Sequence, residues 1–225
     1  MAALLTKDHG VVRAAVKGAR GSRKRAAALQ ILTEVKTTYF RREGADLARL
    51  SALEIVNSSF ELASRAETAM LLPYLAESVV TFVPESEPGD EVYRLVRHVL
   101  DALLAGVPAP VATRYFEVWL LRFAGLVPEA RECAVCGAPL GEADVRLDPE
   151  IPGFVSGSCA RPGAFRIPAS ALRFLAEIRR RKLPDVAPPS KETDAAVEEL
   201  TREIRRRFLG HELKSYRFLT SLTAT

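Results

Sequence analysis

The stretch YFEVWLLRFAGLVPEARECAVCG, residues 115–137, joins a strongly apolar segment to a Cys-x2-Cys pair. In residues 111–124 the polar side chains are nearly confined to Thr113, Arg114, Glu117 and Arg122. A helix that is apolar on so many sides is typical of the middle of a helical domain. Its 14 residues are too few, and too often interrupted by charge, to span a bilayer. The rest of the chain is therefore expected to pack around this helix.

The composition is that of an ordinary soluble globular chain. It has 225 residues, of which 48% are hydrophobic and 27% charged, which suits one to three domains. There is no secretory h-region and no apolar run of about 18 residues, so we expect a cytoplasmic protein without a membrane segment. No phosphate-cradling Gly-x4-Gly-Lys-Ser/Thr loop is present, so we do not expect ATP use.

The net charge of +4 is unevenly placed. Residues 1–50 carry 11 basic and 4 acidic side chains (net +7), residues 51–130 carry 5 and 11 (net −6), and residues 131–225 carry 16 and 13 (net +3). A basic first segment of this kind predicts that a polyanion contacts the N-terminal part of the chain.

The first fifty-odd residues have a β pattern. Residues 10–17 alternate, with apolar side chains on one face and Arg13 and Lys17 on the other. Residues 18–25 contain two glycines and four cations, which predicts a mobile loop. Residues 29–40 alternate again, and a turn over residues 41–46 leads to a short strand over 47–53. Together they predict a small antiparallel meander with one cationic face.

Helical periodicity follows. We expect a helix from the capping residue Ser64 to about residue 82, kinked at Pro73, and an amphipathic helix over residues 92–104. After the cysteine segment, residues 168–181 predict a helix whose basic end suits a helix C-terminus rather than a DNA site. A last helix is capped by Ser190 or Thr193, and its arginines at 202–207 are expected to form a salt-bridged face.

Four motifs in succession resemble the bacterial RecO family of DNA repair proteins. They are VKGARGSRKR (residues 16–25), RYFEVWLLRFAGLVPEARECAVCG (114–137), FVSGSC (154–159) and LKSYRFL (213–219). Each is weak alone, but their order and spacing are specific, and the likeness runs almost from end to end.

The resemblance implies an α+β multidomain protein. Residues 1–56 would form an OB-like β-barrel that binds nucleic acid, and residues 57–130 the first part of an all-α helical domain. Residues 131–166 would form a small zinc-finger-like insertion with cysteines, and residues 167–225 the C-terminal part of the helical domain. RecO proteins are not enzymes. They bind single- and double-stranded DNA, anneal complementary strands, and help to load recombinase with RecR and the C-terminal tail of the single-stranded-DNA-binding protein.

Two departures from the family pattern bear on these expectations. Family members usually carry an additional strand before the segment LLTKDHG, so we expect a barrel that lacks its first strand and leaves residues 10–17, or their neighbour, as an unpaired edge. Many members also have a second Cys-x2-Cys, whereas here Cys159-Ala-Arg is followed by Pro162. Structural zinc is therefore a possible cofactor with three candidate ligands, Cys133, Cys136 and Cys159, and no evident fourth. We expect a structural segment with low zinc occupancy.

The candidate DNA-binding residues are the cations of the basic first segment and of the last motif. They are Arg13, Lys17, Arg20, Arg23, Lys24, Arg25, Lys214 and Arg217. An RNA-binding OB-fold protein is an alternative that charge does not separate from a DNA-binding one. A zinc-dependent nucleic-acid hydrolase or deaminase is a weaker alternative, because no His-x-Glu accompanies the cysteines.

Overall fold

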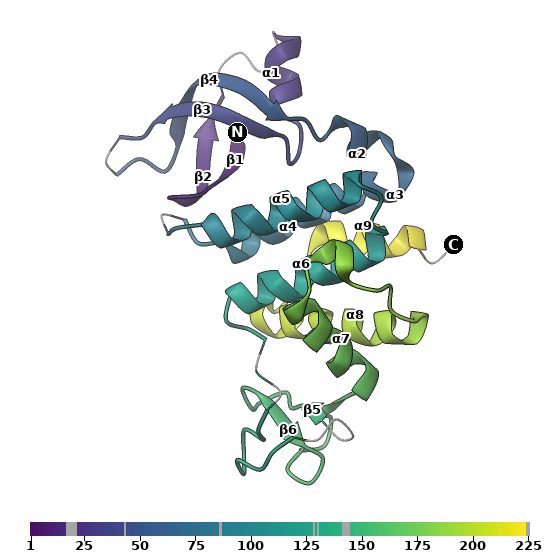
Figure 1. The fold of residues 1–225 in the computed structure, drawn as a ribbon. Helices are drawn as coiled ribbons and strands as arrows, with labels where there is room; N and C mark the ends of the chain where they lie inside the picture. Colours follow the sequence, from purple (N-terminus) through teal and green to yellow (C-terminus); the bar gives the residue numbers. More distant parts are fainter. Residues whose placement is uncertain are drawn as a thin grey trace. The chain divides into compact units, whose positions relative to one another are not determined.

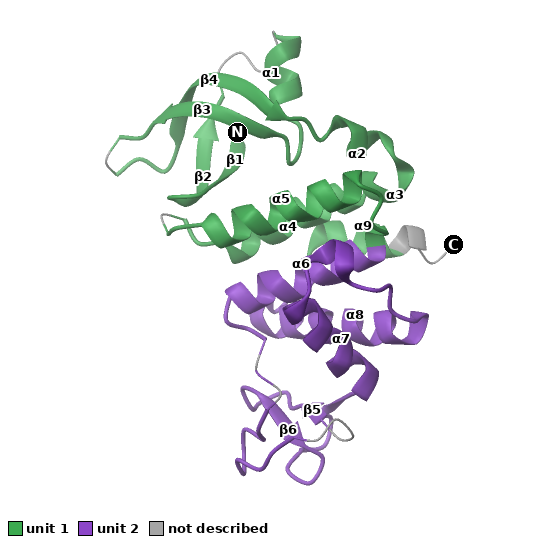
Figure 2. Cartoon of the chain, in the orientation of Figure 1, with its two compact units in different colours: residues 1–109, 213–225 green, residues 110–212 purple. Residues whose placement is uncertain are grey.

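The structure is a computed structural model that describes residues 1–16, 22–42, 44–85, 87–127, 129, 131–140 and 145–223. The chain divides into two compact units (Figure 2). Unit 1 contains Met1–Ala109 together with Leu213–Thr225, and unit 2 contains Pro110–Glu212. The last helix therefore belongs to the same unit as the first strands.

Unit 1 begins with a four-stranded sheet. Its strands are β1 (Ala2–Thr6), β2 (Gly10–Ala15), β3 (Glu34–Phe40) and β4 (Ala48–Asn57), in the order β1-β2-β4-β3. The pairs β1/β2 and β3/β4 are antiparallel, whereas β2/β4 is parallel. The strand-rich start followed by helices confirms the α+β class, but the described strands form an open sheet and do not close into a barrel.

The expected unpaired edge does not fall on β2. β1 pairs with β2 from Ala2↔Ala14 to Thr6↔Gly10, and β4 pairs with it through Ala14 and Ala15. The edges of the described sheet are its neighbour β1 and, on the far side, β3.

A short helix overlaps the predicted loop, and the strand predicted from residue 29 starts later than expected. α1 spans Arg23–Ala28, and its N-cap Ser22 accepts a hydrogen bond from the Arg25 backbone N–H at 3.4 Å. Three alanines favour helix here, and Leu32 has a positive φ of 57°, so the strand starts only at Glu34. The prediction of a loop over residues 18–25 was wrong for 23–25, and residues 17–21 lie outside the described residues.

The predicted helix over residues 64–82 is broken into three. α2 spans Phe60–Ser64, α3 Ala66–Ala69 and α4 Leu71–Phe82. Ser64 therefore ends a helix instead of capping one. Pro73 lies in the first turn of α4, where its missing N–H has no intrahelical partner to lose, so the predicted kink was wrong.

The helices α4 and α5 (Asp90–Leu104) lie along one side of the sheet and contact β1 (Figure 1). The loop between them approaches the β1–β2 hairpin very closely. The Gly89 backbone N–H donates to the Lys7 carbonyl at 2.8 Å, and a Cβ on Gly10 would lie 2.3 Å from the Pro84 carbonyl oxygen. Gly10 also has φ +57°, so glycine is required at this contact.

Unit 2 is built around α6 (Ala109–Phe123), the helix predicted to organise the chain. Residues 111–118 of this helix are all buried. After it come a three-stranded sheet in the order β6-β5-β7 and then three more helical segments. These elements are β5 (Val145–Leu147), β6 (Phe154–Ser156), β7 (Phe165–Ile167), α7 (Ala169–Arg180), η2 (Leu183–Asp185) and α8 (Lys191–Leu209). Ser190 is the N-cap of α8.

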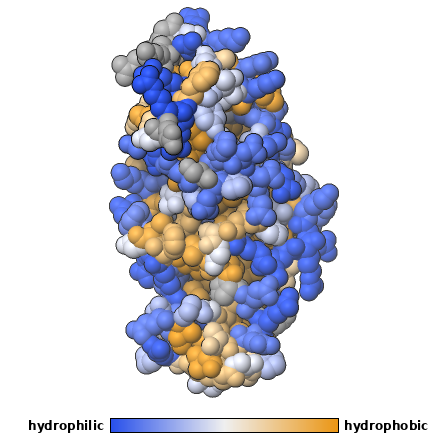
Figure 3. Space-filling view, turned by 90° about the vertical axis from the view of Figure 1, so that its left-hand side faces the viewer, coloured by the Kyte–Doolittle hydropathy of each residue, from blue (hydrophilic) through white to orange (hydrophobic). Residues whose placement is uncertain are grey.

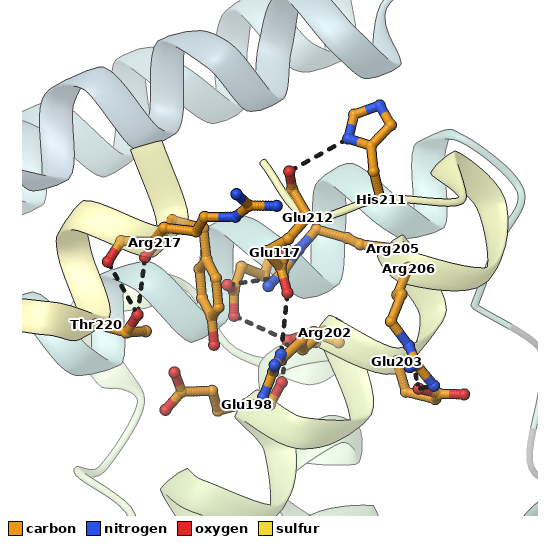
Figure 4. A network of polar contacts seen from close by, with 12 residues as sticks. Glu117, Glu198, Arg202, Glu203, Arg205, Arg206, His211, Glu212, Arg217 and Thr220 are labelled. Carbon is orange, nitrogen blue, oxygen red and sulfur yellow. Dashed lines mark hydrogen bonds and ion pairs between the residues drawn. The ribbon is translucent and has the colours of Figure 1, made fainter. Parts of the chain in front are cut away.

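A buried ion network joins α6 to α8. Glu117 accepts a hydrogen bond from Arg205 at 2.9 Å (Figure 4). It accepts another from Arg114 at 2.6 Å. Arg114 also pairs with Asp194 at 3.1 Å and Glu198 at 2.7 Å. The Arg205 and Glu117 side chains are only 2% and 1% exposed. This buried ion pair therefore fixes the register of the two helices in addition to their apolar packing.

In the parts of the chain that the structure describes, none of the helices combines the length and the hydrophobicity that crossing a membrane requires.

Candidate nucleic-acid interface and cysteine site

The sheet of unit 1 has one buried and one open face. Val12, Ala14 and Ala48 are buried on the inner face, with Tyr39 and Leu50 packed against them. Side chains alternate along a strand, so the intervening residues project from the opposite face. The exposed residues of this face include Arg13 on β2, Lys36 and Phe40 on β3, and Arg49 on β4, and the exposed Glu54 of β4 lies opposite Lys36. We call this set the outer sheet face.

Arg13 is the only predicted DNA-binding residue that the described structure places on the outer sheet face. Its Nε atom donates to Glu85 Oε1 at 2.6 Å, and both side chains are well exposed. A solvent-exposed pair of this kind contributes little and exchanges readily, so the pairing does not prevent Arg13 from meeting a phosphate.

The three predicted cations of α1 form a second group. Arg23, Lys24 and Arg25 are exposed along a helix that packs against β4. Lys17 and Arg20, predicted with them, lie outside the described residues. In the view of Figure 3, hydrophilic residues dominate the upper part, where the sheet of unit 1 lies.

Lys214 and Arg217 lie on α9 (Lys214–Thr223), which packs against α4. Both side chains are exposed, but the structure does not bring them together with the cations of α1. α4 and α5 lie between α9 and the sheet (Figure 1).

Three outer-face residues that could contact nucleic acid, Lys36, Phe40 and Arg49, were missed by sequence reasoning. Phe40 is 67% exposed and pairs with Arg49 across β3 and β4. Arg49 also pairs with Ala15 of β2. Strand alternation shows which side chains share a face only when the pairing of neighbouring strands is known. The pairing of β2, β3 and β4 was therefore needed before these residues could be found.

In unit 2 the structure brings the three cysteines together. The sulfur atoms of Cys133, Cys136 and Cys159 all lie within 4.8 Å of one another. The Cys133 backbone N–H donates to the Ala138 carbonyl at 2.8 Å, and the Gly137 N–H donates to the Cys133 carbonyl at 2.9 Å. These bonds fold residues 133–138 into a tight knuckle that aims two sulfurs at the third.

The knuckle also favours a thiolate at one position. The Ser156 backbone N–H donates to Cys133 Sγ at 3.4 Å. This bond, with a second from the Cys136 backbone N–H, lowers the pKa of the Cys133 thiol to about 6. The N–H of Ala138 favours the Cys136 thiolate, but the Cys159 and Cys133 sulfurs act against it and raise the pKa of Cys136 overall.

Thiolates are preferred ligands of zinc, so the three cysteines fit three of the four positions of a structural zinc site. Among the described residues no histidine or carboxylate joins them. Asp148 is not available as a fourth ligand, because its two carboxylate oxygens accept hydrogen bonds from the backbone N–H groups of Glu150 and Arg161, each at 3.0 Å. The hydrogen bond from Glu150 is the main cause that holds the pKa of Asp148 below its usual value.

The cysteine segment is fixed to α8 by Arg207. The guanidinium donates to the Asp148 carbonyl at 2.6 Å and to the Leu147 carbonyl at 3.4 Å, while its Nε atom donates to Glu203 at 2.8 Å. The ion pair with Glu203 agrees with the salt-bridged face predicted for residues 202–207, and Arg207 has an additional role that spacing could not show.

An arginine-lined cavity of about 610 Å³ lies between the end of α6, the cysteine segment and α7. Its apolar lining includes Val118, Val145, Phe154 and Leu172. Glu129 pairs with three nearby arginines at 3.0–3.5 Å, so part of the positive charge is compensated. The lining arginines are Arg122, Arg131, Arg173, Arg179, Arg180 and Arg181.

Comparison with known proteins supports the family assignment at both ends of the chain. The family model described as "Recombination protein O N terminal" matches residues 1–59, and "Recombination protein O C terminal" matches residues 63–217. The chain is 36% identical to the DNA repair protein RecO of Anaeromyxobacter sp. (strain K) over 226 residues, which covers 97% of this chain and 88% of that protein. It is 30% identical to the RecO protein of Myxococcus xanthus (strain DK1622) over 228 residues, 97% of this chain and 89% of that one.

Proposed function

Because the chain belongs to the RecO family of DNA repair and recombination proteins, we propose that it is a DNA-binding recombination mediator with no catalytic activity of its own. The observation that carries this proposal is the concentration of exposed cations on α1 and the outer sheet face. Residues 1–56 would make the main nucleic-acid contacts, through Arg13, Arg23, Lys24 and Arg25.

The mediator would bind single- and double-stranded DNA, anneal complementary strands, and help to load recombinase on strands coated by the single-stranded-DNA-binding protein. RecR and the tail of that coating protein are the proposed partners, and the cytoplasm is the proposed compartment. The arginine-lined cavity supports a tail-binding role for unit 2, because an anionic peptide with an apolar end group matches its cationic rim and apolar lining.

The hydrolase alternative is less well supported by the site. Catalytic zinc needs an open coordination position and a nearby general base. Asp148, a carboxylate of the cysteine segment, is fully buried and already accepts hydrogen bonds from two backbone N–H groups. The RNA-binding alternative is open, and competition between matched DNA and RNA strands separates it from the proposal.

A strand-annealing assay on the purified protein tests the proposal. We expect the protein to accelerate the annealing of complementary strands, both bare and coated with the single-stranded-DNA-binding protein. A free peptide with the sequence of that protein's tail should inhibit only the reaction of coated strands, because bare strands do not need the tail. Failure to accelerate annealing of bare strands at low salt contradicts the annealing role.

A further inference from the structure

The outer sheet face carries an aromatic side chain that phosphate binding alone does not use. We infer that Phe40 is a base-stacking position for a single strand of nucleic acid, with Arg49 beside it as the partner of the strand's phosphate. This inference rests on the proposed function and assigns the part of the sheet that would hold an unpaired base.

The first observation is the exposure of Phe40. It is 67% exposed although it ends a strand whose preceding residue, Tyr39, packs on the inner core. Strand alternation fixes this direction, because a side chain next to an inward-facing one must point outward. Phe40 therefore offers an aromatic ring to solvent from a backbone that is hydrogen-bonded to β4.

The second observation is the charge around the ring. Arg49 lies directly opposite Phe40 in the antiparallel pair, where Cβ atoms are about 5 Å apart. The Arg49 side chain makes no hydrogen bond or ion pair with another side chain that the structure describes. Arg13 of β2 lies on the same face. Arg42 lies two residues beyond Phe40 in the chain, after the end of β3. A ring with cations beside it matches the combination by which proteins bind single strands, in which bases stack and phosphates pair.

A single exposed apolar residue is common and needs no function, so a comparison within the chain is useful. Phe60 of α2 is 63% exposed and belongs to the same unit, but the next residue is the acidic Glu61. The two phenylalanines differ little in exposure and greatly in surrounding charge. Of these two, Phe40 is the one with cations beside it.

The arrangement also predicts which form of nucleic acid is affected. A base in a duplex is stacked on both sides and is not available to a protein ring, whereas an unpaired base is available. Phe40 should therefore contribute to binding of single strands and not of duplexes. Arg49, which contacts phosphate, should contribute to both.

The test compares Phe40→Ala with Phe60→Ala in the full-length protein. Affinity is measured for a thymidine oligonucleotide, for an abasic strand of the same length, and for a duplex. We expect Phe40→Ala to weaken binding of the thymidine strand by about 5- to 100-fold. Binding of the abasic strand and of the duplex should stay unchanged. Phe60→Ala should change none of the three, and Phe40→Trp should restore thymidine binding.

The outcomes separate the inference from the proposed function. If the unmodified protein binds none of the three ligands at low salt, the proposed DNA-binding function itself is wrong. If it binds them and Phe40→Ala leaves thymidine binding unchanged, only the stacking role is wrong. An equal loss on the abasic strand would also overturn it, because the ring would then support the sheet rather than a base.

Discussion

Glu77 of α4 holds the last helix of the chain, α9, in place within unit 1. Its carboxylate accepts the backbone N–H groups of Lys214 and Ser215 at 3.1 and 2.7 Å, and it also accepts the Ser215 hydroxyl. These are the free donors of the first turn of α9, so a side chain from α4 supplies a cap that the local sequence does not. Tyr216 of α9 packs on Tyr74 of α4, with ring centroids 5.6 Å apart.

The cap should make stability depend on pH. Partial burial opposes ionisation of Glu77, but the hydrogen bonds from Ser215 and Lys214 outweigh it and hold the pKa of Glu77 below its usual value. A carboxyl whose pKa is lower in the folded state stabilises the fold above the unfolded pKa of about 4.3. That contribution is lost as pH falls through the folded pKa. We expect Glu77→Gln to lower the free energy of unfolding by about 1 kcal/mol at neutral pH.

Urea denaturation at neutral and acid pH measures this difference. The deficit of the Glu77→Gln variant should shrink as pH falls below about 4.3 and through the lower folded pKa, because the wild-type carboxyl then becomes protonated as well. The exposed Glu67 of α3, in the same unit, provides the control: Glu67→Gln should show no comparable deficit. A deficit that is independent of pH would mean that Glu77 acts by packing rather than by charge.

At the scale of elements, sequence periodicity predicted the long helices well and the short ones poorly. α5 was predicted from a repeated apolar spacing and α6 from its nearly continuous apolar sequence, while α7 and α8 also carry signals at their ends, a basic C-terminus and a capping residue. α1 has six residues, and α2 to α4 are separated by single residues, so their limits depend on Ser22 and on tertiary contacts. The parallel pairing of β2 with β4 could not be predicted from the sequence either, because α1 and β3 lie between these strands in the chain.

The cysteine segment is an element whose stability should not depend on zinc. It has its own three-stranded sheet, the backbone bonds to Asp148, and the Arg207 contact to α8. A closed structural site needs four ligands, and three are present among the described residues. We expect well under one zinc per chain after dialysis, measured by elemental analysis.

A strong chelator should then leave the melting temperature of the protein unchanged. Cys159→Ser should have a similarly small effect, because removing one of three ligands changes little when the metal is not needed. About one zinc per chain after extensive dialysis, or a fall in melting temperature on chelation, would show that a fourth ligand completes the site.

At the scale of the whole molecule, the sequence predicted where charge is concentrated but not how it is used. The acidic middle segment supplies Glu117, which is buried between Arg114 and Arg205. Hydropathy treated these residues as solvent-facing, since no local pattern reveals that α8 covers α6. Arg13 and Glu85 form another such ion pair, between residues that are 72 positions apart in the sequence. Long-range pairing of this kind needs the fold.

The last prediction distinguishes DNA binding through a specific charged surface on α1 from binding that depends only on the net charge of the protein. Single-strand affinity should fall with salt, with a log-log slope of about 0.7 for each phosphate neutralised. Replacing Arg23, Lys24 and Arg25 of α1 with alanine should reduce that slope by up to about 2, on unrelated sequences alike. A matched triple change of Arg180, Lys182 and Lys191 removes the same charge from exposed positions of unit 2. If α1 is a contact surface, only the first variant changes the slope. Equal changes of slope in both variants would mean that net charge governs binding. A loss of affinity for only one DNA sequence would mean that α1 contacts bases.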